Sequence, residues 1–216
     1  MSVSSGMLVP VMPLYARSLE ASYSLVGLML AAQGLGTLLS DVPAGVLVRR
    51  WGHKRAMILG ALFTVLGTVS LVWASSLVEA VAYRLLAGAG AALWGISRHA
   101  YLAELVQVQR RGRSIAVLGG IGRIGTFLGP AIGGVLAAYW GLRSPFAAFA
   151  LMGLAALAAA ALWVPDGERG TGASLPQARL GRVLAGHWRP LLSAGSGQLC
   201  AQMVRNARHA VIPLYL

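Results

Sequence analysis

The sequence predicts an all-α protein that crosses a membrane several times. Of its 216 residues, 57% are hydrophobic and only 11% are charged, whereas a water-soluble domain of this length needs more polar surface to cover its core. The hydrophobic residues form runs of about 20 residues, the length that a helix needs to span a bilayer. Such runs are too long for the strands of an outer-membrane barrel and lack their alternating pattern.

Six apolar segments are long enough to cross the bilayer as helices. They cover roughly 24–48, 56–74, 77–104, 114–139, 145–163 and 190–212. A shorter apolar stretch at roughly 3–16 precedes them, and its length of about 13 residues falls short of a full crossing. We therefore expect the first span to be incomplete in this sequence.

The positive charges indicate which loops face the cytoplasm. The formal net charge is +12, from 18 Lys and Arg residues against 6 Asp and Glu residues. Most of the cations fall in three alternate loops, at 49–55, 105–113 and 164–189, and this bias places those loops on the cytoplasmic side of the cell (inner) membrane. Cations beside a membrane attract anionic lipid headgroups, which explains the basic composition without a nucleic-acid partner.

The sequence lacks the patterns that support enzyme or cofactor chemistry. Cys200 is the single cysteine, so neither an intrachain disulfide nor a multi-cysteine metal site is expected. Lys54 is the only lysine and lies in a loop, which excludes a retinal Schiff base within a span. There is no Gly-x-Ser-x-Gly or His-Glu-x-x-His pattern. We expect no metal, no cofactor and no enzymatic activity.

An internal repeat relates the second and fifth spans. Residues 36–52 match residues 125–141, which lie 89 positions later, without a gap and with 8 identities in 17 positions. The first copy ends in the pair Arg49-Arg50, and the second copy lacks that pair. A cationic end on only one copy is typical of two copies that cross the membrane in opposite directions.

A second match and three motifs resemble the major facilitator superfamily. Residues 11–15 match residues 211–215, 200 positions later, and the two offsets together resemble that family's inverted three-helix units within parallel six-helix halves. Residues 45–55 resemble its loop motif between helices 2 and 3, and residues 84–92 its helix-4 motif. Residues 125–134 match its helix-5 motif G-x-x-x-G-P-x-x-G-G, which in the family marks exporters that exchange drugs or metabolites for protons. The motif positions that we expect to serve conformational change are Gly45, Arg50, Gly52, Gly88, Gly125, Gly129, Pro130, Gly133 and Gly134.

One position departs from the family pattern. The loop motif has an acidic residue where this chain has Arg49. In the family that carboxylate helps to latch the two halves in one conformation, so the resemblance implies that the latch is absent or rebuilt here. Asp41 lies two turns earlier, inside the membrane, and cannot simply replace it.

The charged residues inside the spans have two interpretations each. Asp41 is the only carboxylate well inside a span, and Arg98 and Arg123 lie at comparable depth. Asp41 forms a static ion pair with one of them, or it takes up and releases the coupling proton. For Arg84, in the outer part of the fourth span, the resemblance implies a part in proton exchange. The alternative for Arg84 is that it satisfies helix ends.

The glycines of the fifth span predict a close helix contact. Gly125, Gly129 and Gly133 are four residues apart and therefore share one face, where small residues let helix backbones approach closely. Pro130 permits a bend. In the family this bent, closely packed helix is thought to seal the cavity against leak, and packing is the means by which it does so.

Four further residues are candidates for the substrate cavity. Arg205 and Arg208 are three apart and share a helix face. They attract an anionic substrate or lipid, or they reach to the membrane interface. Tyr83 and Trp94 fit cavity lining and helix packing equally well.

The resemblance implies a specific architecture and function. Residues 1–163 form a six-helix bundle with an inverted 3+3 repeat, residues 164–189 a basic cytoplasmic linker, and residues 190–216 the first helix of a second bundle. We interpret the chain as truncated. The predicted function is proton-coupled efflux of small hydrophobic or amphipathic molecules by alternating access, with the substrate, the proton and the bilayer as partners. The alternatives are an uptake symporter of a small metabolite, or a half-transporter with no activity of its own that needs the missing C-terminal half.

Overall fold

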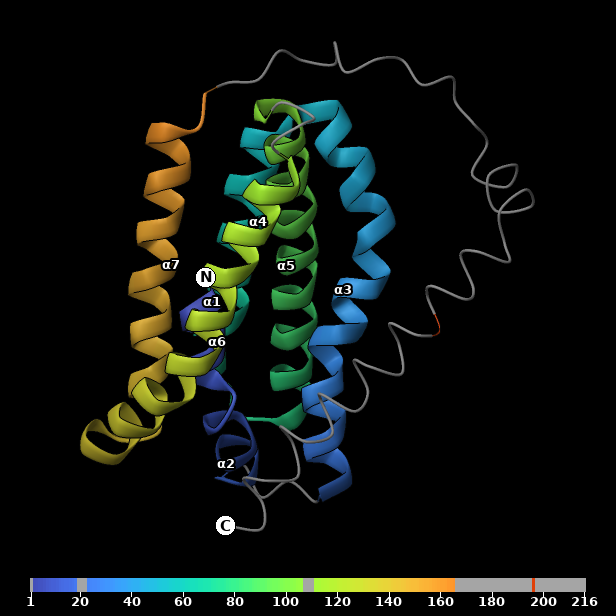
Figure 1. Cartoon of the computed structure of the whole chain (residues 1–216). Helices are drawn as coiled ribbons and strands as arrows, with labels where there is room; N and C mark the ends of the chain where they lie inside the picture. The colour runs from blue at the N-terminus through green and yellow to red at the C-terminus, as the bar shows by residue number, and fades with distance from the viewer. Residues whose placement is uncertain (1, 19–22, 107–110, 166–195, 197–216) are drawn as a thin grey trace. The chain divides into compact units, whose positions relative to one another are not determined.

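The computed structural model describes residues 2–18, 23–106, 111–165 and 196, and this part of the chain contains helices and no strands (Figure 1). The elements are α1 (Ser2–Leu8), α2 (Val11–Ser18), α3 (Tyr23–Trp51), α4 (His53–Val69), the 3-10 helix η1 (Ser70–Trp73), α5 (Leu77–Leu105), α6 (Arg111–Trp140) and α7 (Ser144–Trp163).

Five helices in the described residues are long and apolar enough to cross a membrane. They are Gly27–Trp51, His53–Trp73, Leu77–Leu105, Gly112–Trp140 and Ser144–Trp163. The predicted all-helical, multiply spanning fold is thereby confirmed, with five of the six expected spans in place. The sixth, at 190–212, lies outside the described residues, as does nearly all of the expected linker at 164–189.

The short first span is two helices rather than one. α1 ends at Leu8 and α2 begins at Val11, because Pro10 has no amide hydrogen to donate and disfavours the helical conformation of the residue before it. The amide of Val9 instead donates to the carbonyl of Gly6, with an N···O distance of 3.2 Å.

The start of α5 is defined by two serines and a glutamate. The Ser76 hydroxyl accepts a hydrogen bond from the Glu79 amide (3.3 Å), and the Glu79 carboxylate accepts one from the Ser75 amide (2.9 Å). This reciprocal arrangement satisfies amides that the first helical turn leaves free. It fixes the residue at which α5, the helix that contains Arg84, begins.

Both copies of the internal repeat end a helix in the same way. α3 and α6 each end at a tryptophan, Trp51 and Trp140, and the glycine that follows has a positive φ, 82° at Gly52 and 86° at Gly141. Each of these glycine amides still donates to the carbonyl four residues earlier, at 2.9 Å and 3.0 Å respectively. The equivalence inferred from the sequence therefore extends to backbone conformation.

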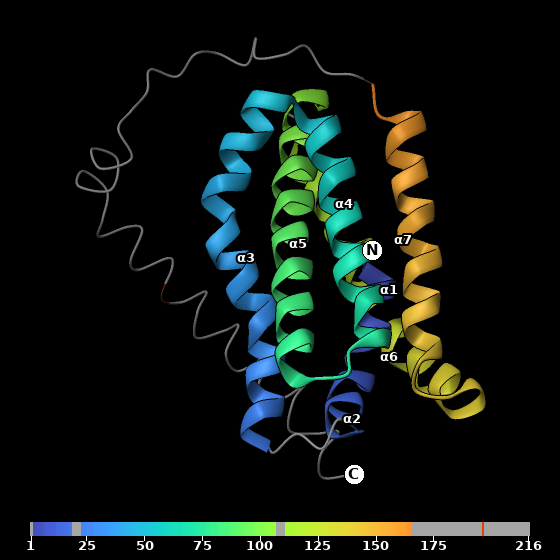
Figure 2. The same cartoon turned by 180° about the vertical axis from the view of Figure 1, so that it is seen from behind.

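The helix contacts follow the inverted repeat. α3 packs mainly on α5, and α6 packs mainly on α1. α4 lies against α5 and α7, and α1 also touches α7. In the inverted repeat α1 corresponds to α5, α3 to α6 and α4 to α7. The α3–α5 contact then corresponds to the α6–α1 contact, and the α4–α5 contact corresponds to the α7–α1 contact. Both views show α4 and α5 between α3 and α7 (Figures 1 and 2).

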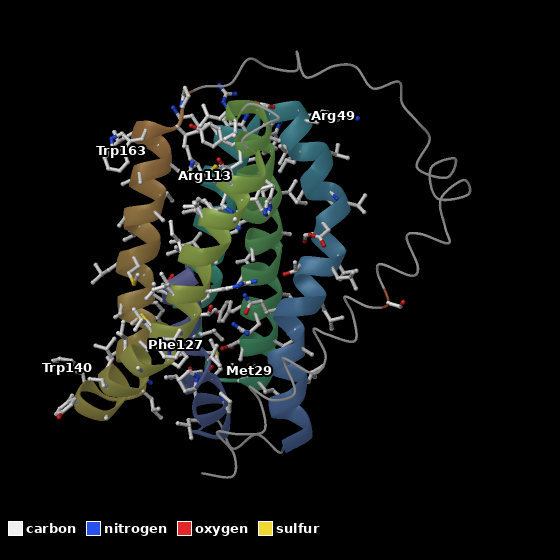
Figure 3. All side chains as sticks on the ribbon, in the orientation of Figure 1. Met29, Arg49, Arg113, Phe127, Trp140 and Trp163 are labelled. Atoms are coloured by element: carbon white, nitrogen blue, oxygen red, sulfur yellow. The ribbon has the colours of Figure 1, made fainter. Side chains whose placement is uncertain are left out.

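The two ends of the helices differ in charge. Arg49 and Arg113 lie towards the same end as Trp163, whereas Met29 and Trp140 lie towards the opposite end (Figure 3). This distribution agrees with a single cationic side, which the sequence predicts for the loop at 49–55 and the start of α6.

Candidate functional site

Arg84 is a buried cation on α5. Its side chain is 7% exposed, and its Nε has no hydrogen-bond partner among the described residues. No ion pair joins it to a carboxylate in the described ranges. An unpaired charge within a membrane span is costly and by default indicates a functional site.

Glycine contacts on both sides fix the orientation of Arg84. Gly88 lies against the α3 backbone at Gln33 and Thr37, and Gly90 lies against Thr64 of α4. The Thr37 hydroxyl also donates to the Gly88 carbonyl at 3.1 Å. α5 is thus held closely to two neighbours, and Arg84 projects between the directions of those two contacts.

Arg98 lies on the same side of α5 as Arg84, between the contacts with α3 and α4, and we call this side the inner side. It lies about 40° from Arg84 around the helix axis and about 21 Å further along it. Its Nε is also buried without a partner, as is the indole Nε1 of Trp94. Between the two arginines, a side chain at Gly95 would meet nothing within 4 Å. The inner side of α5 therefore combines unsatisfied hydrogen-bond donors with open space.

Asp41 does not form an ion pair with Arg98 or Arg123, which its comparable depth in the membrane had suggested. It is exposed on α3, and the structure records no ion pair between it and Arg98 or Arg123. Asp41 lies one turn along α3 from Thr37, whose hydroxyl donates to the Gly88 carbonyl of α5, so Asp41 lies at the exposed edge of the contact between α3 and α5. Arg123 is likewise exposed, on α6.

The glycines of α6 meet α1. A Cβ at Gly129 would come within 2.7 Å of the Gly6 Cα, and a Cβ at Gly133 would clash with the Met7 carbonyl. Gly125 is buried on the same face, and its carbonyl lies against Gly6. The close approach expected from the four-residue spacing is therefore present. The sequence did not identify its partner, the glycine of the short α1.

Gly134 and Gly45 lie on open faces instead. These equivalent positions of the repeat have nothing within 4 Å of a Cβ. Pro130 is half-buried. Its Cδ would lie 3.5 Å from a Cβ added to Gly6. The helix-5 motif is thus divided between a packed face and an open one.

His53 of the loop motif contacts a carboxylate that the sequence did not identify as its partner. Nδ1 of His53, in the first turn of α4, lies 3.0 Å from Oε2 of Glu104, in the last turn of α5. The His53 side chain is buried, and its ring lies 5.2 Å from that of Tyr101. Arg49 and Arg50 are exposed beside it. The sequence did contain a signal for this contact, because two successive antiparallel helices place the start of the first beside the end of the second.

The candidate cavity residues fall into three groups. Tyr83 is partly buried and packs against the hydrophobic core around Tyr15 and Phe146. Trp94 presents an unpaired donor and stays a candidate for the cavity. Arg205 and Arg208 lie outside the described residues.

Comparisons with known proteins agree with this arrangement. An uncharacterised MFS-type transporter of Methanocaldococcus jannaschii is 26% identical over 151 residues, covering 70% of this chain and 39% of the relative. Multidrug resistance protein 2 of Bacillus subtilis is 30% identical over 143 residues, covering 65% of this chain and 35% of the relative. The chain therefore matches well under half the length of these two relatives.

A solved structure shares the fold. The inward-open xylose transporter of E. coli superposes with a TM-score of 0.58 at 18% identity, covering 97% of this chain and 55% of that one. The family model described as Major Facilitator Superfamily matches residues 1–211. Nearly the whole sequence thus fits one family of multi-pass membrane proteins, and the chain belongs to the major facilitator superfamily.

Proposed function

We propose that this chain forms the six-helix half of a secondary transporter that exports small hydrophobic or amphipathic molecules in exchange for protons. Family membership supports transport, and the resemblance to a relative named for multidrug resistance supports export. The observation that carries the proposal is Arg84, a buried cation without a recorded partner on the inner side of α5.

Arg84 supports proton coupling through its effect on a neighbouring acid. A cation in a low-dielectric site favours the deprotonated form of any carboxyl group that approaches it, and burial away from a cation favours the protonated form. A carboxyl group that moves between these two environments takes up a proton in one and releases it in the other. Asp41 is the carboxylate inside a described span that we assign to this role.

The contact between α1 and α6 supports a sealed barrier during exchange. The backbones at Gly129 and Gly133 touch those at Gly6 and Met7, so the crossing leaves no room for side chains or water. Pro130 lies at this crossing. We assign these residues to preventing leak between the two sides of the membrane.

The open faces of α3 and α6 support the docking of a second bundle. Alternating access rocks one six-helix bundle against the other around a site near the midplane. Gly34 and Gly45 on α3 and Gly134 on α6 meet nothing within 4 Å, and small residues in membrane helices typically serve helix contacts. By the positive-inside rule, the end with Arg49 faces the cytoplasm of the inner membrane.

Transport by everted membrane vesicles tests the proposal. Vesicles containing the protein encoded by the complete reading frame are acidified inside and given ethidium, a hydrophobic cation. We expect ethidium accumulation that collapses with the pH gradient, and at least a tenfold lower initial rate for Arg84→Gln. Arg143→Gln, which removes an exposed arginine, serves as the control and retains the rate.

Two results contradict the proposal. Accumulation by correctly inserted Arg84→Gln at the wild-type rate excludes a role for that arginine. Acid-driven accumulation in right-side-out vesicles, without export in everted ones, excludes the efflux direction and favours the uptake symporter.

A further inference from the structure

A groove lies where α3 meets α4, away from the candidate transport site. It is lined by Trp51, Arg55, Ile58 and Leu59 and has a volume of about 370 Å³. The groove is at the same end of the helices as Arg49.

The groups along the groove follow the order of a phospholipid. Arg55, Ile58 and Leu59 are three and four residues apart and therefore share one face of α4. Since α4 begins at His53 and runs into the span, the cation lies nearest the membrane surface and the two aliphatic side chains lie a turn deeper. Trp51 is 47% exposed at the end of α3, a typical position for an interfacial aromatic residue.

Exposed arginines gather at this end of the helices. Arg49, Arg50 and Arg55 are all exposed, and no ion pair of Arg55 is recorded within the described ranges. Glu104, the carboxylate in a terminal turn at this end, is engaged by His53. An arginine at a membrane surface without a protein counter-charge attracts anionic lipid.

The chain's own loops on this side are poor occupants of the groove. The segment 105–113 carries three arginines and no acidic residue, and the segment 164–189 carries four arginines against two acidic residues. Both segments are therefore repelled by the arginines that surround the groove. An anionic amphiphile meets both the charge and the apolar floor.

We propose that this groove binds an anionic phospholipid, with the lipid phosphate on Arg55 and an acyl chain along Ile58 and Leu59. The indole of Trp51 lies at the level of the glycerol backbone. Trp51 and Arg55 belong to the loop motif of residues 45–55 but take no part in the proposed proton exchange, so the lipid site stands independently of the efflux direction and its coupling.

Quenching of tryptophan fluorescence by brominated lipids tests the site. The full chain is reconstituted in phosphatidylcholine bilayers that contain increasing fractions of dibrominated phosphatidylglycerol or dibrominated phosphatidylcholine. The difference between wild type and Trp51→Phe isolates the signal of Trp51. We expect phosphatidylglycerol to be preferred about fivefold, the factor that corresponds to about 1 kcal/mol for one arginine at an anionic surface.

Two variants separate a defined site from general attraction. Arg55→Gln is expected to reduce the preference to about one, whereas Arg113→Gln, an exposed arginine at the same end on α6, is expected to retain it. Circular dichroism verifies that both variants are folded. Equal quenching of Trp51 by the two lipids, or equal loss of preference in both variants, overturns the proposal.

Discussion

Gly129 of α6 lies against Gly6 of α1 so closely that a Cβ at Gly129 would come within 2.7 Å of the Gly6 Cα and 2.8 Å of the Val3 carbonyl oxygen. The obstructing atoms belong to the backbone, which cannot rotate away as a side chain can. Two helices of the inverted repeat are therefore joined at a point where only glycine fits. This contact is also the place where α1, which is too short to span a membrane alone, is held in the bundle.

Gly129→Val is expected to destabilise the protein by about 1–3 kcal/mol, because an overpacked side chain must push α1 away from α6. Thermal unfolding in detergent measures the effect. Gly120→Val is the matched control, since a side chain nine residues earlier on the same helix meets nothing within 4 Å. Equal stability of the two variants contradicts the assigned contact.

Gly52 is expected to be required for its backbone conformation alone. Its φ of 82° and ψ of 161° lie in a region that is almost restricted to glycine and costs other residues about 1–3 kcal/mol. No atom lies within 4 Å of a Cβ at this position, so steric contact contributes nothing. Gly52→Ala is therefore expected to lower the unfolding free energy by that amount.

Gly119→Ala provides the comparison for Gly52→Ala. Gly119 is also open, but it lies inside α6 without a positive φ. Alanine is favoured over glycine within a helix by about 1 kcal/mol. The two substitutions are expected to shift the unfolding midpoint in opposite directions, and a stabilising Gly52→Ala would show that the turn between α3 and α4 has another conformation.

The helices were predictable from the sequence because their signals are local. Apolar length identified the five described spans, and the glycine spacing identified the packed face of α6. The sequence also related Trp51-Gly52 to Trp140-Gly141, and both pairs end a helix with positive φ. Apolar length and glycine spacing depend on residues within a few turns of one another, and the repeat is recognised by comparing two segments of sequence without knowing their contacts.

The pairing of residues from different helices was not predictable in the same way. Depth in the membrane placed Asp41 level with Arg98, but depth does not specify direction around the helix axis, and Asp41 lies at the exposed edge of the contact between α3 and α5. The partner of the α6 glycines was missed because spacing identifies a face but not the helix that covers it. The His53–Glu104 pair was missed because it lies in the terminal turns of two helices, where hydropathy carries no signal.

Asp41→Asn is expected to abolish proton-driven export while leaving the unfolding free energy unchanged. Asp41 is exposed and has no recorded ion pair in the described residues, so its charge contributes little to stability. A static buried pair behaves differently, because removing one partner costs about 3–5 kcal/mol. Ethidium export at two pH values and thermal unfolding of the same samples distinguish these cases. Export that retains its pH dependence in Asp41→Asn excludes this residue as the proton carrier.

Pro130→Leu is expected to weaken the barrier to leak at the crossing of α1 and α6 without lowering the stability of the protein. Leucine restores the amide that proline lacks, and a proline inside a helix costs about 3 kcal/mol relative to a good helix former. The variant is therefore expected to unfold no earlier than wild type. Replacing the proline ring, however, changes the fit of α6 against Gly6, which lies beside that ring.

The expected consequence is leak or inactivity, measured as dissipation of a pH gradient in vesicles without substrate. Pro43→Leu is the matched control, because Pro43 is also inside a helix but is exposed on α3, where no such crossing depends on it. If both variants retain the gradient and export at the wild-type rate, the bend at Pro130 does not contribute to the barrier. If only Pro130→Leu dissipates it, the crossing of α1 and α6 is the element that keeps the two sides of the membrane separate.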